Sequence, residues 1–114
     1  MIHKDLKAWQ ESMDLVVTIY KVTSKFRDEE KYGLTTQLRR ASVSVPSNIA
    51  EGSARKGNKE YIQFLYVALG SLAELDTQLE IAHNLEFIDS FTEIEVRTKY
   101  IRNLIIGLIN KLKQ

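Results

Sequence analysis

Apolar and polar positions alternate along the chain with the period of an α-helix in four successive stretches. In residues 4–26, apolar side chains recur three and four residues apart, and charged side chains occupy the other side. The inward stripe predicted for this first helix consists of Leu6, Trp9, Met13, Val16 and Tyr20. Similar spacing begins again near residues 34, 59 and 92, after polar or glycine-containing segments. The pattern predicts four long helices.

The second predicted helix begins near residue 34 and contains the only proline of the chain, Pro46. Its stripe of small residues continues in phase across the proline and consists of Leu38, Ala41, Val45, Ile49 and Gly52. A proline inside a helix removes one backbone hydrogen bond and crowds the carbonyl group four residues earlier. We therefore expect one helix with a kink near residues 42–46 rather than two separate helices.

The third predicted helix covers residues 59–85 and carries a strict 4-3 alternation, which is typical of a coiled-coil seam. The seam consists of Tyr61, Leu65, Ala68, Leu72, Leu75, Leu79 and Ala82. Asn58 is expected to cap the start of this helix. Gly70, in its middle, suggests tight packing against another helix, because a helical glycine costs about 1 kcal/mol relative to alanine. Thr92 and Glu95 predict a capping box at the start of the fourth helix.

Four long helices joined by short loops predict an all-α fold, an up-down-up-down four-helix bundle with a proline-kinked second helix. A chain of 114 residues is expected to form a single domain, residues 1–114. The fourth helix has a second apolar face, formed by Leu104, Ile106 and Ile109. In a monomer this face would expose a large apolar patch. We therefore expect it to form the interface of a homo-oligomer.

Composition narrows the possible functions. The chain has no cysteine, which excludes thiol catalysis and cysteine-based zinc sites. Its N-terminus is charged and lacks the apolar core of a signal peptide, and the longest strongly apolar run, residues 104–109, is too short to span a bilayer. The expected location is the cytoplasm.

Candidate motifs for metal binding and catalysis are incomplete. A di-iron bundle needs two Glu-x-x-His motifs, and the chain has one, Glu80 to His83. The other histidine, His3, lies outside any such motif, and His83 is expected at the surface. The serines of the second helix lack a nucleophile elbow, and no phosphate-binding glycine loop is present. We expect no metal, no cofactor and no enzymatic activity.

Charge is distributed unevenly, although the formal net charge is only +1. Residues 34–59 hold five basic side chains against one acid, whereas residues 60–114 hold five against eight. The five basic residues are Arg39, Arg40, Arg55, Lys56 and Lys59. Together they predict a phosphate-facing surface, and because aromatic residues are not interleaved with them, binding is expected to the nucleic-acid backbone. The alternative is a solvated face on which the arginines pair with Glu51 or with acids of the third helix, such as Glu74, Asp76 and Glu80.

Three neighbouring residues of the second helix suggest a structural role. Asn48 lies beside the inward stripe, Glu51 follows about one turn later, and Gly52 comes next. We interpret Asn48, Glu51 and Gly52 as a polar network that fixes the register of the helix. The alternative is that they form part of a site for a partner.

The same region carries a resemblance to a known family. The run GLTxQLRRAxVSVPxNIAEG, residues 33–52, is similar to the signature of four-helix-bundle proteins encoded in intervening sequences of bacterial 23S ribosomal RNA genes. The run ALGSLxELxTQL, residues 68–79, extends the similarity, and Trp9 and Tyr20 fit the first helix of the family. Arg39 and Arg40 match basic positions of the family, whereas Arg55, Lys56 and Lys59 lie in its more variable linker.

The resemblance implies a homo-oligomer, typically a pentamer, with a positively charged surface and no established enzymatic activity. It also implies the fold of the accessory variability proteins of diversity-generating retroelements, which associate with a reverse transcriptase and nucleic acid. Two functions follow as hypotheses. The first is RNA or DNA binding through the basic residues, and the second is a protein-interaction scaffold that docks a partner such as a reverse transcriptase.

Overall fold

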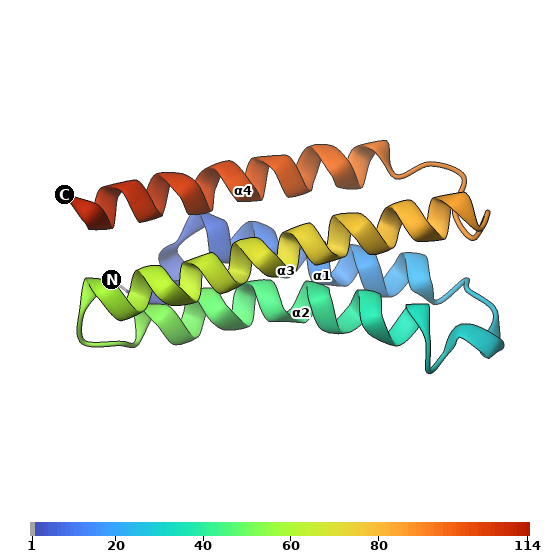
Figure 1. Ribbon diagram of the computed structural model, residues 1–114, viewed down its shortest axis with the longest axis horizontal. Coiled ribbons are helices and arrows are strands. Elements are labelled where there is room, and N and C mark those ends of the chain that lie inside the picture. Colours follow the sequence, from blue (N-terminus) through green and yellow to red (C-terminus); the bar gives the residue numbers. More distant parts are fainter. Residues whose placement is uncertain (1) are drawn as a thin grey trace.

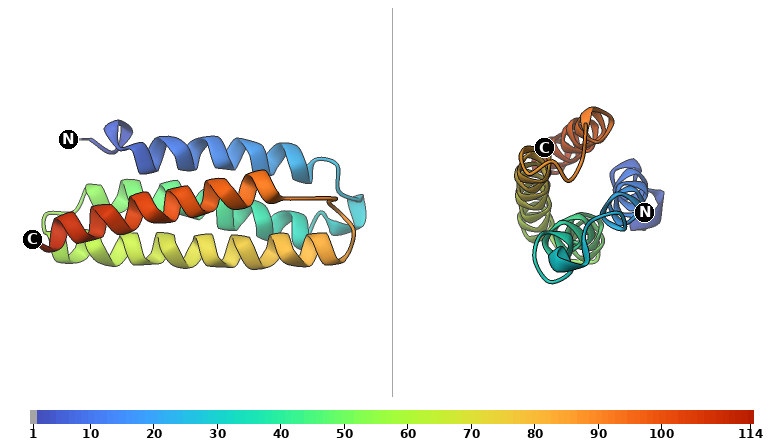
Figure 2. Two further views of the ribbon diagram at one scale, coloured as in Figure 1. Left: turned by 90° about the horizontal axis from the view of Figure 1, so that it is seen from above. Right: turned by 90° about the vertical axis from the view of Figure 1, so that its right-hand side faces the viewer.

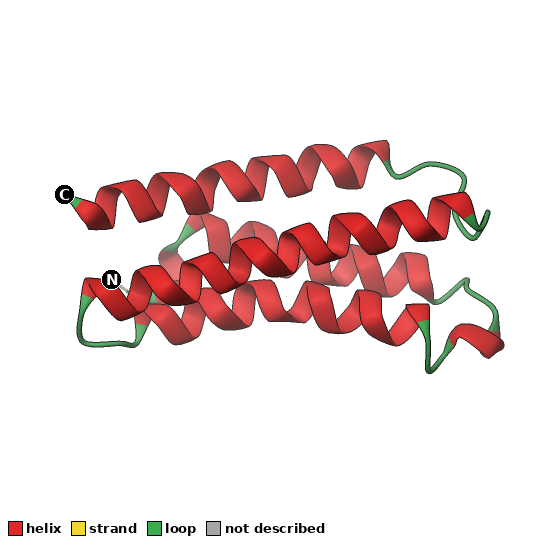
Figure 3. Cartoon of the chain, viewed as in Figure 1, coloured by secondary structure: helices red, strands yellow, loops and turns green. Residues whose placement is uncertain are grey.

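The computed structural model describes residues 2–114 and shows a bundle of four long helices (Figure 1). The helices are α1 (Lys7–Thr23), α2 (Leu34–Ser53), α3 (Asn58–Asn84) and α4 (Thr92–Lys113), with short 3-10 turns at η1 (His3–Asp5) and η2 (Asp28–Glu30). Successive helices run in opposite directions, and the described part of the chain consists of helices and loops (Figures 2 and 3). The predicted all-α four-helix bundle is confirmed. It measures 45 × 24 × 20 Å.

The core lies along the axis of the bundle and contains the predicted stripes of α2 and α3, together with Ile94, Ile101, Ile105 and Ile109 of α4. In α3, six of the seven predicted seam residues are buried, and Tyr61 packs at the edge of the core. Burying a leucine or isoleucine contributes about 1.5–3 kcal/mol to folding. The apolar groups that hold the four helices together therefore include the fully buried side chains Leu15, Ile19, Leu38, Val45, Ile49, Leu65, Leu72, Leu75, Leu79 and Ile105.

The inward face of α1 differs from the one predicted. Leu15 and Ile19 are fully buried, together with the small residues Ala8 and Ser12. Met13 and Tyr20, which were placed in the predicted stripe, are exposed. The Ser12 hydroxyl is satisfied inside the helix by donating to the Ala8 carbonyl oxygen at 2.6 Å. Because Met13, Val17 and Tyr20 are exposed, α1 presents apolar side chains to solvent on its outer face.

Helix α2 continues through Pro46 to Ser53, so the prediction of a single helix is confirmed, while the kink stays a prediction. Near its end, α2 lies very close to α3. A Cβ atom added at Gly52 would lie 2.8 Å from the Phe64 Cβ atom and 3.2 Å from the Tyr61 carbonyl oxygen. Gly52 therefore has a steric role at this crossing. Burial raises the pKa of the Tyr61 phenol, because the charged form would be partly desolvated.

Two predicted helix caps are displaced by one residue. Gly57 precedes α3 as its cap, and the Asn58 side chain instead donates to the Leu112 carbonyl oxygen of α4 at 3.2 Å. Phe91 caps α4 because its carbonyl oxygen accepts the first helical bond, from Glu95 N–H at 2.8 Å. Phe91 also packs against the core, which fixes the start of α4 and leaves the predicted Thr92–Glu95 capping box unformed.

The interpretation of Gly70 was wrong for the isolated chain. A Cβ atom added at Gly70 would meet no other atom within 4 Å, and the residue is exposed on α3. Gly107 of α4 has equally open surroundings.

Among the described helices, none combines the length and the apolar character that crossing a membrane requires.

Candidate nucleic-acid interface

The two adjacent arginines of α2 have different surroundings. Arg39 reaches back to α1, where its Nε atom donates to the Thr23 hydroxyl at 2.8 Å and its Nη2 atom lies 3.4 Å from the Tyr20 carbonyl oxygen. Its guanidinium also lies over the Tyr20 ring, 4.5 Å from the centroid. Arg39 is thus half-buried and joins α1 to α2, a structural role that sequence reasoning missed.

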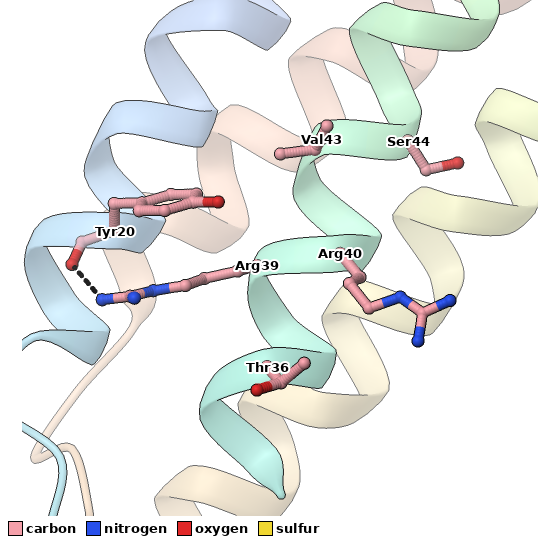
Figure 4. Close-up of a pocket in the computed structure, with 6 residues that line it drawn as sticks. All are labelled: Tyr20, Thr36, Arg39, Arg40, Val43 and Ser44. Atoms are coloured by element: carbon pink, nitrogen blue, oxygen red, sulfur yellow. Dashed lines mark hydrogen bonds between the residues drawn. The ribbon is translucent and has the colours of Figure 1, made fainter. Parts of the chain in front are cut away.

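Arg40 points away from α1 (Figure 4). It borders a surface hollow of about 450 Å³ that is lined by Tyr20, Thr36, Arg39, Arg40, Val43 and Ser44. The three ion pairs found within residues 2–114 involve neither arginine. Asp76, one of the predicted partners, instead accepts a bond from Arg102 at 2.7 Å. Glu74, another predicted partner, lines a neighbouring hollow with Arg40 but forms no ion pair with it. Arg40 is the exposed member of the arginine pair and the better placed of the two to meet a phosphate.

This difference predicts unequal effects on stability. Arg39→Ala removes a hydrogen bond to a buried threonine and a cation–π contact, and is expected to lower the free energy of unfolding by about 1–2 kcal/mol. Arg40→Ala is expected to change it by less than about 0.5 kcal/mol, because the residue is exposed. Urea denaturation of the two variants measures both values. Equal losses would contradict the assigned roles.

Of the other three predicted basic residues, Arg55 and Lys56 lie in the turn between α2 and α3, and Lys59 lies in the first turn of α3. Arg55, Lys56 and Lys59 are exposed. Arg55 lies 4.8 Å from the centroid of the Phe64 ring and 3.8 Å from the Glu60 carboxylate, an exposed pair of little energetic weight. Fifteen residues separate Arg40 from Arg55, which along a helix is about 22 Å. The five predicted residues therefore form two separate sites and not one continuous surface.

The end of the bundle that contains this turn also contains the end of α4 (Figure 1). The bond from Asn58 to the Leu112 carbonyl oxygen ties the two segments together. Lys111 and Lys113 flank this contact, and the Lys113 ammonium lies 3.3 Å from the Tyr66 hydroxyl of α3. We call Arg55, Lys56, Lys59, Lys111 and Lys113 the basic end. Residues 54–60 and 111–114 together hold these five cations and one acid.

The opposite end of the bundle has the opposite charge. It contains the α1–α2 and α3–α4 connections (Figure 1). Residues 27–33 and 86–95 hold seven acidic side chains and two basic ones. Although the net charge is near zero, the charges are separated along the molecule, which is about 45 Å long and has one positive and one negative end. Such a separation orients a polyanion toward the basic end.

The predicted polar network is present in part. The Asn48 amide donates to the Ser44 carbonyl oxygen at 2.8 Å and contacts the Ser44 hydroxyl at 2.9 Å. The Ser44 hydroxyl in turn lies 2.7 Å from the Ser71 hydroxyl of α3, so the network joins the two helices. Glu51 is exposed on the outer side of α2 and does not belong to it. Gly52 contributes by close packing and not by hydrogen bonding.

The predicted oligomer residues of α4 are divided between the core and the surface. Ile109 is only 3% exposed and packs in the core of the chain itself, so its assignment to an interface is corrected. Leu104 is partly buried against the core, and Ile106 is 40% exposed. The outer side of α4 also exposes Val96 and Tyr100, which the sequence pattern did not single out.

Neither histidine forms part of a metal-binding cluster. His83 is exposed, as predicted, and its ring packs edge-on against Phe91 at 5.6 Å, whereas His3 packs against Trp9 at 5.2 Å. Within residues 2–114, no group of three metal-ligating side chains comes together.

Comparisons with known proteins match most of the chain. Residues 4–107 match the family model described as 23S rRNA-intervening sequence protein. No curated protein matches the sequence. Among solved structures, the bundle is similar to a protein with unknown function from the S23 ribosomal protein family of Bacteroides thetaiotaomicron. The two share 24% sequence identity with a TM-score of 0.83, over 90% of this chain and 95% of the other, a likeness that shows the fold.

Proposed function

The chain belongs to the 23S rRNA-intervening sequence protein family, and from this premise we propose that it is a non-enzymatic, cytoplasmic, homo-oligomeric bundle that binds the backbone of RNA or DNA. The observation that carries the proposal is the basic end. There, Arg55 and Lys56 of the α2–α3 turn and Lys59 at the start of α3 lie at the same end of the bundle as Lys111 and Lys113 of α4, and the Asn58–Leu112 bond joins the two segments. Arg40 adds a separate cation on the side of the bundle.

The proposed mechanism is electrostatic. Each lysine or arginine that neutralises a phosphate releases a condensed counterion, and this release favours binding most strongly at low salt. The exposed ammonium groups of Lys56 and Lys59 suit this role, because flexible side chains can follow phosphates without fixed geometry. Contacts of this kind read no base edges, so we expect weak sequence preference.

A binding titration tests this function. Labelled single-stranded RNA and duplex DNA are titrated with the purified protein at low salt, and fluorescence anisotropy reports the bound fraction. Binding of either polymer is the expected result. An absence of binding to both would overturn the proposal in favour of a protein partner.

The proposed homo-oligomer uses the outer side of α4, where Val96, Tyr100 and Ile106 are exposed. Open space around the nearby Gly107 would let a helix of a second copy approach closely. Association would bring several basic ends together and strengthen their combined field.

Tyr100→Glu is expected to dissociate the oligomer, because it places a charge in an apolar contact where desolvation is costly. Light scattering should then give the mass of a monomer at micromolar concentration. Tyr32→Glu is the matched control, since Tyr32 is 88% exposed in a loop at the acidic end and should leave the mass unchanged. A wild-type protein that is monomeric would contradict the proposed assembly.

One observation favours a protein-interaction scaffold as the second candidate. The outer face of α1 exposes Met13 and Val17, and an apolar hollow of about 470 Å³ is lined by Val16, Val17, Tyr20, Lys21 and Ser24. A partner such as a reverse transcriptase could bury these side chains. Pull-down of the partner protein with wild type and with Val17→Glu separates the two candidate functions. A scaffold of this kind should lose its partner in Val17→Glu, whereas nucleic-acid binding does not require Val17.

A further inference from the structure

The fold places an aromatic ring beside the arginine pair, although none is close to it in the sequence. Tyr20 of α1 and Arg39 of α2 are nineteen residues apart, yet the guanidinium carbon lies 4.5 Å from the ring centroid. Tyr20 is 43% exposed, so the pair forms part of the molecular surface. Figure 4 shows the ring and the guanidinium facing one another at the hollow that Arg40 also lines.

The pair is held in place from several directions. The Arg39 Nε atom donates to the Thr23 hydroxyl, which itself donates to the Ile19 carbonyl oxygen at 2.7 Å. Thr23 is only 2% exposed, so its position is fixed by the core. The planar group of Arg39 is therefore ordered before any ligand arrives, which reduces the entropy lost on binding.

We propose that the Tyr20–Arg39 pair is a stacking platform for an unpaired base of single-stranded nucleic acid, with Arg40 placed to meet a neighbouring phosphate. The proposal rests on the nucleic-acid-binding function proposed above and specifies its substrate as a strand with unpaired bases. It also revises the expectation of backbone contacts alone, which assumed that no aromatic residue lay near the arginines.

The chemistry of the hollow matches this ligand. Aromatic rings and arginine guanidinium planes are the two surfaces on which proteins stack unpaired bases. The six residues that line the hollow include two arginines, three hydroxyl groups and no acid, a composition suited to an anionic strand. Its volume of about 450 Å³ lies within the range of about 300–1,000 Å³ typical of small-molecule sites. A base inside a duplex is already stacked on both faces, so single strands should be preferred.

The experiment compares two probes and four proteins. The probes are a labelled single-stranded 12-mer, as RNA and as DNA, and the same strand with abasic positions, which keeps the phosphates but removes the stacking surfaces. The proteins are wild type, Tyr20→Leu, Tyr20→Phe and, as a control, Tyr32→Leu, since Tyr32 is exposed in a loop at the acidic end. Fluorescence anisotropy gives each dissociation constant, and circular dichroism verifies that each variant is folded.

Wild type is expected to lose at least about fivefold in affinity when the bases are removed, and Tyr20→Leu to lose as much on the intact strand. On the abasic strand, Tyr20→Leu should bind like wild type, because the stacking surface is already absent from the probe. Tyr20→Phe keeps the ring and should retain the affinity, as should Tyr32→Leu.

Two results would overturn the platform in distinguishable ways. Equal binding of intact and abasic strands by wild type, with no effect of Tyr20→Leu, would reject the platform but leave backbone binding in place. Binding of neither strand by wild type would reject both. Should Tyr20→Leu fail to fold, wild type and Tyr20→Phe still allow the platform to be rejected, because equal binding of intact and abasic strands by these two folded proteins would show that no base is stacked.

Discussion

Replacing Lys56 and Lys59 together with glutamate is expected to lower the affinity for RNA or DNA by at least about 50-fold near 0.1 M salt. Each phosphate contact of a lysine contributes about eightfold under these conditions through counterion release, and two are lost. The introduced carboxylates add repulsion, so the effect should exceed the simple product. Both side chains are exposed, and changes at such positions alter stability by no more than about 0.5 kcal/mol. Anisotropy titrations measure the loss directly.

A variant with the same change in net charge provides the matched control. Lys25 and Lys31 are exposed at the acidic end of the bundle, so Lys25→Glu with Lys31→Glu also alters the charge by four units. If the basic end is the binding site, this control should retain nearly all of the affinity. Equal losses in both double variants would mean that binding follows only the overall charge and would reject the assigned location.

Gly52→Ala is expected to destabilise the bundle by about 1–3 kcal/mol, although alanine is the better helix former. The added methyl group would lie 2.8 Å from the Phe64 Cβ atom, 3.0 Å from Tyr61 Cδ1 and 3.2 Å from the Tyr61 carbonyl oxygen. The Tyr61 carbonyl oxygen is part of the α3 backbone and the Phe64 Cβ atom is bonded directly to it. Neither atom can turn away, so α2 and α3 must move apart to relieve the contact. Urea denaturation measures the resulting loss in unfolding free energy.

Gly70→Ala is the control for this prediction. The added methyl group would meet nothing within 4 Å, so only the gain in helix propensity remains. Stability should rise by about 0.5–1 kcal/mol. A loss of stability in Gly52→Ala together with a gain in Gly70→Ala would demonstrate that the close approach of α2 and α3, and not helix propensity, decides the effect at Gly52. A gain in stability at both positions would refute the close packing.

Hydrophobic periodicity predicted the four helices well, because a sequence that buries one stripe per helix has few other compact arrangements. The start of α2 and most of the seam of α3 follow directly from spacing. Spacing did not identify the inward face of α1. This helix carries apolar residues on several sides, and only contact with its neighbours selects the stripe containing Leu15 and Ile19 over that containing Met13 and Tyr20.

The candidate site was predictable only in part, because charge along a sequence does not give position in space. The basic segment of residues 34–59 was visible from composition, and it contains three residues of the basic end. Lys111 and Lys113 lie more than fifty residues away and join them only through the antiparallel return of α4. Arg39 appeared equivalent to Arg40, and only its contacts with Tyr20 and Thr23 reveal its different role. The sequence gives one indication that the two arginines differ, because adjacent residues of a helix point about 100° apart.

The salt dependence of binding tests the central claim, that phosphates are held by the basic end, most directly. For wild type, the logarithm of the binding constant plotted against the logarithm of salt concentration should fall with a slope of about −3 to −5, as expected for up to five phosphate contacts. Lys56→Gln with Lys59→Gln should reduce the magnitude of the slope by between one and two. A wild-type slope near zero, or a slope unchanged in the double variant, would contradict the account.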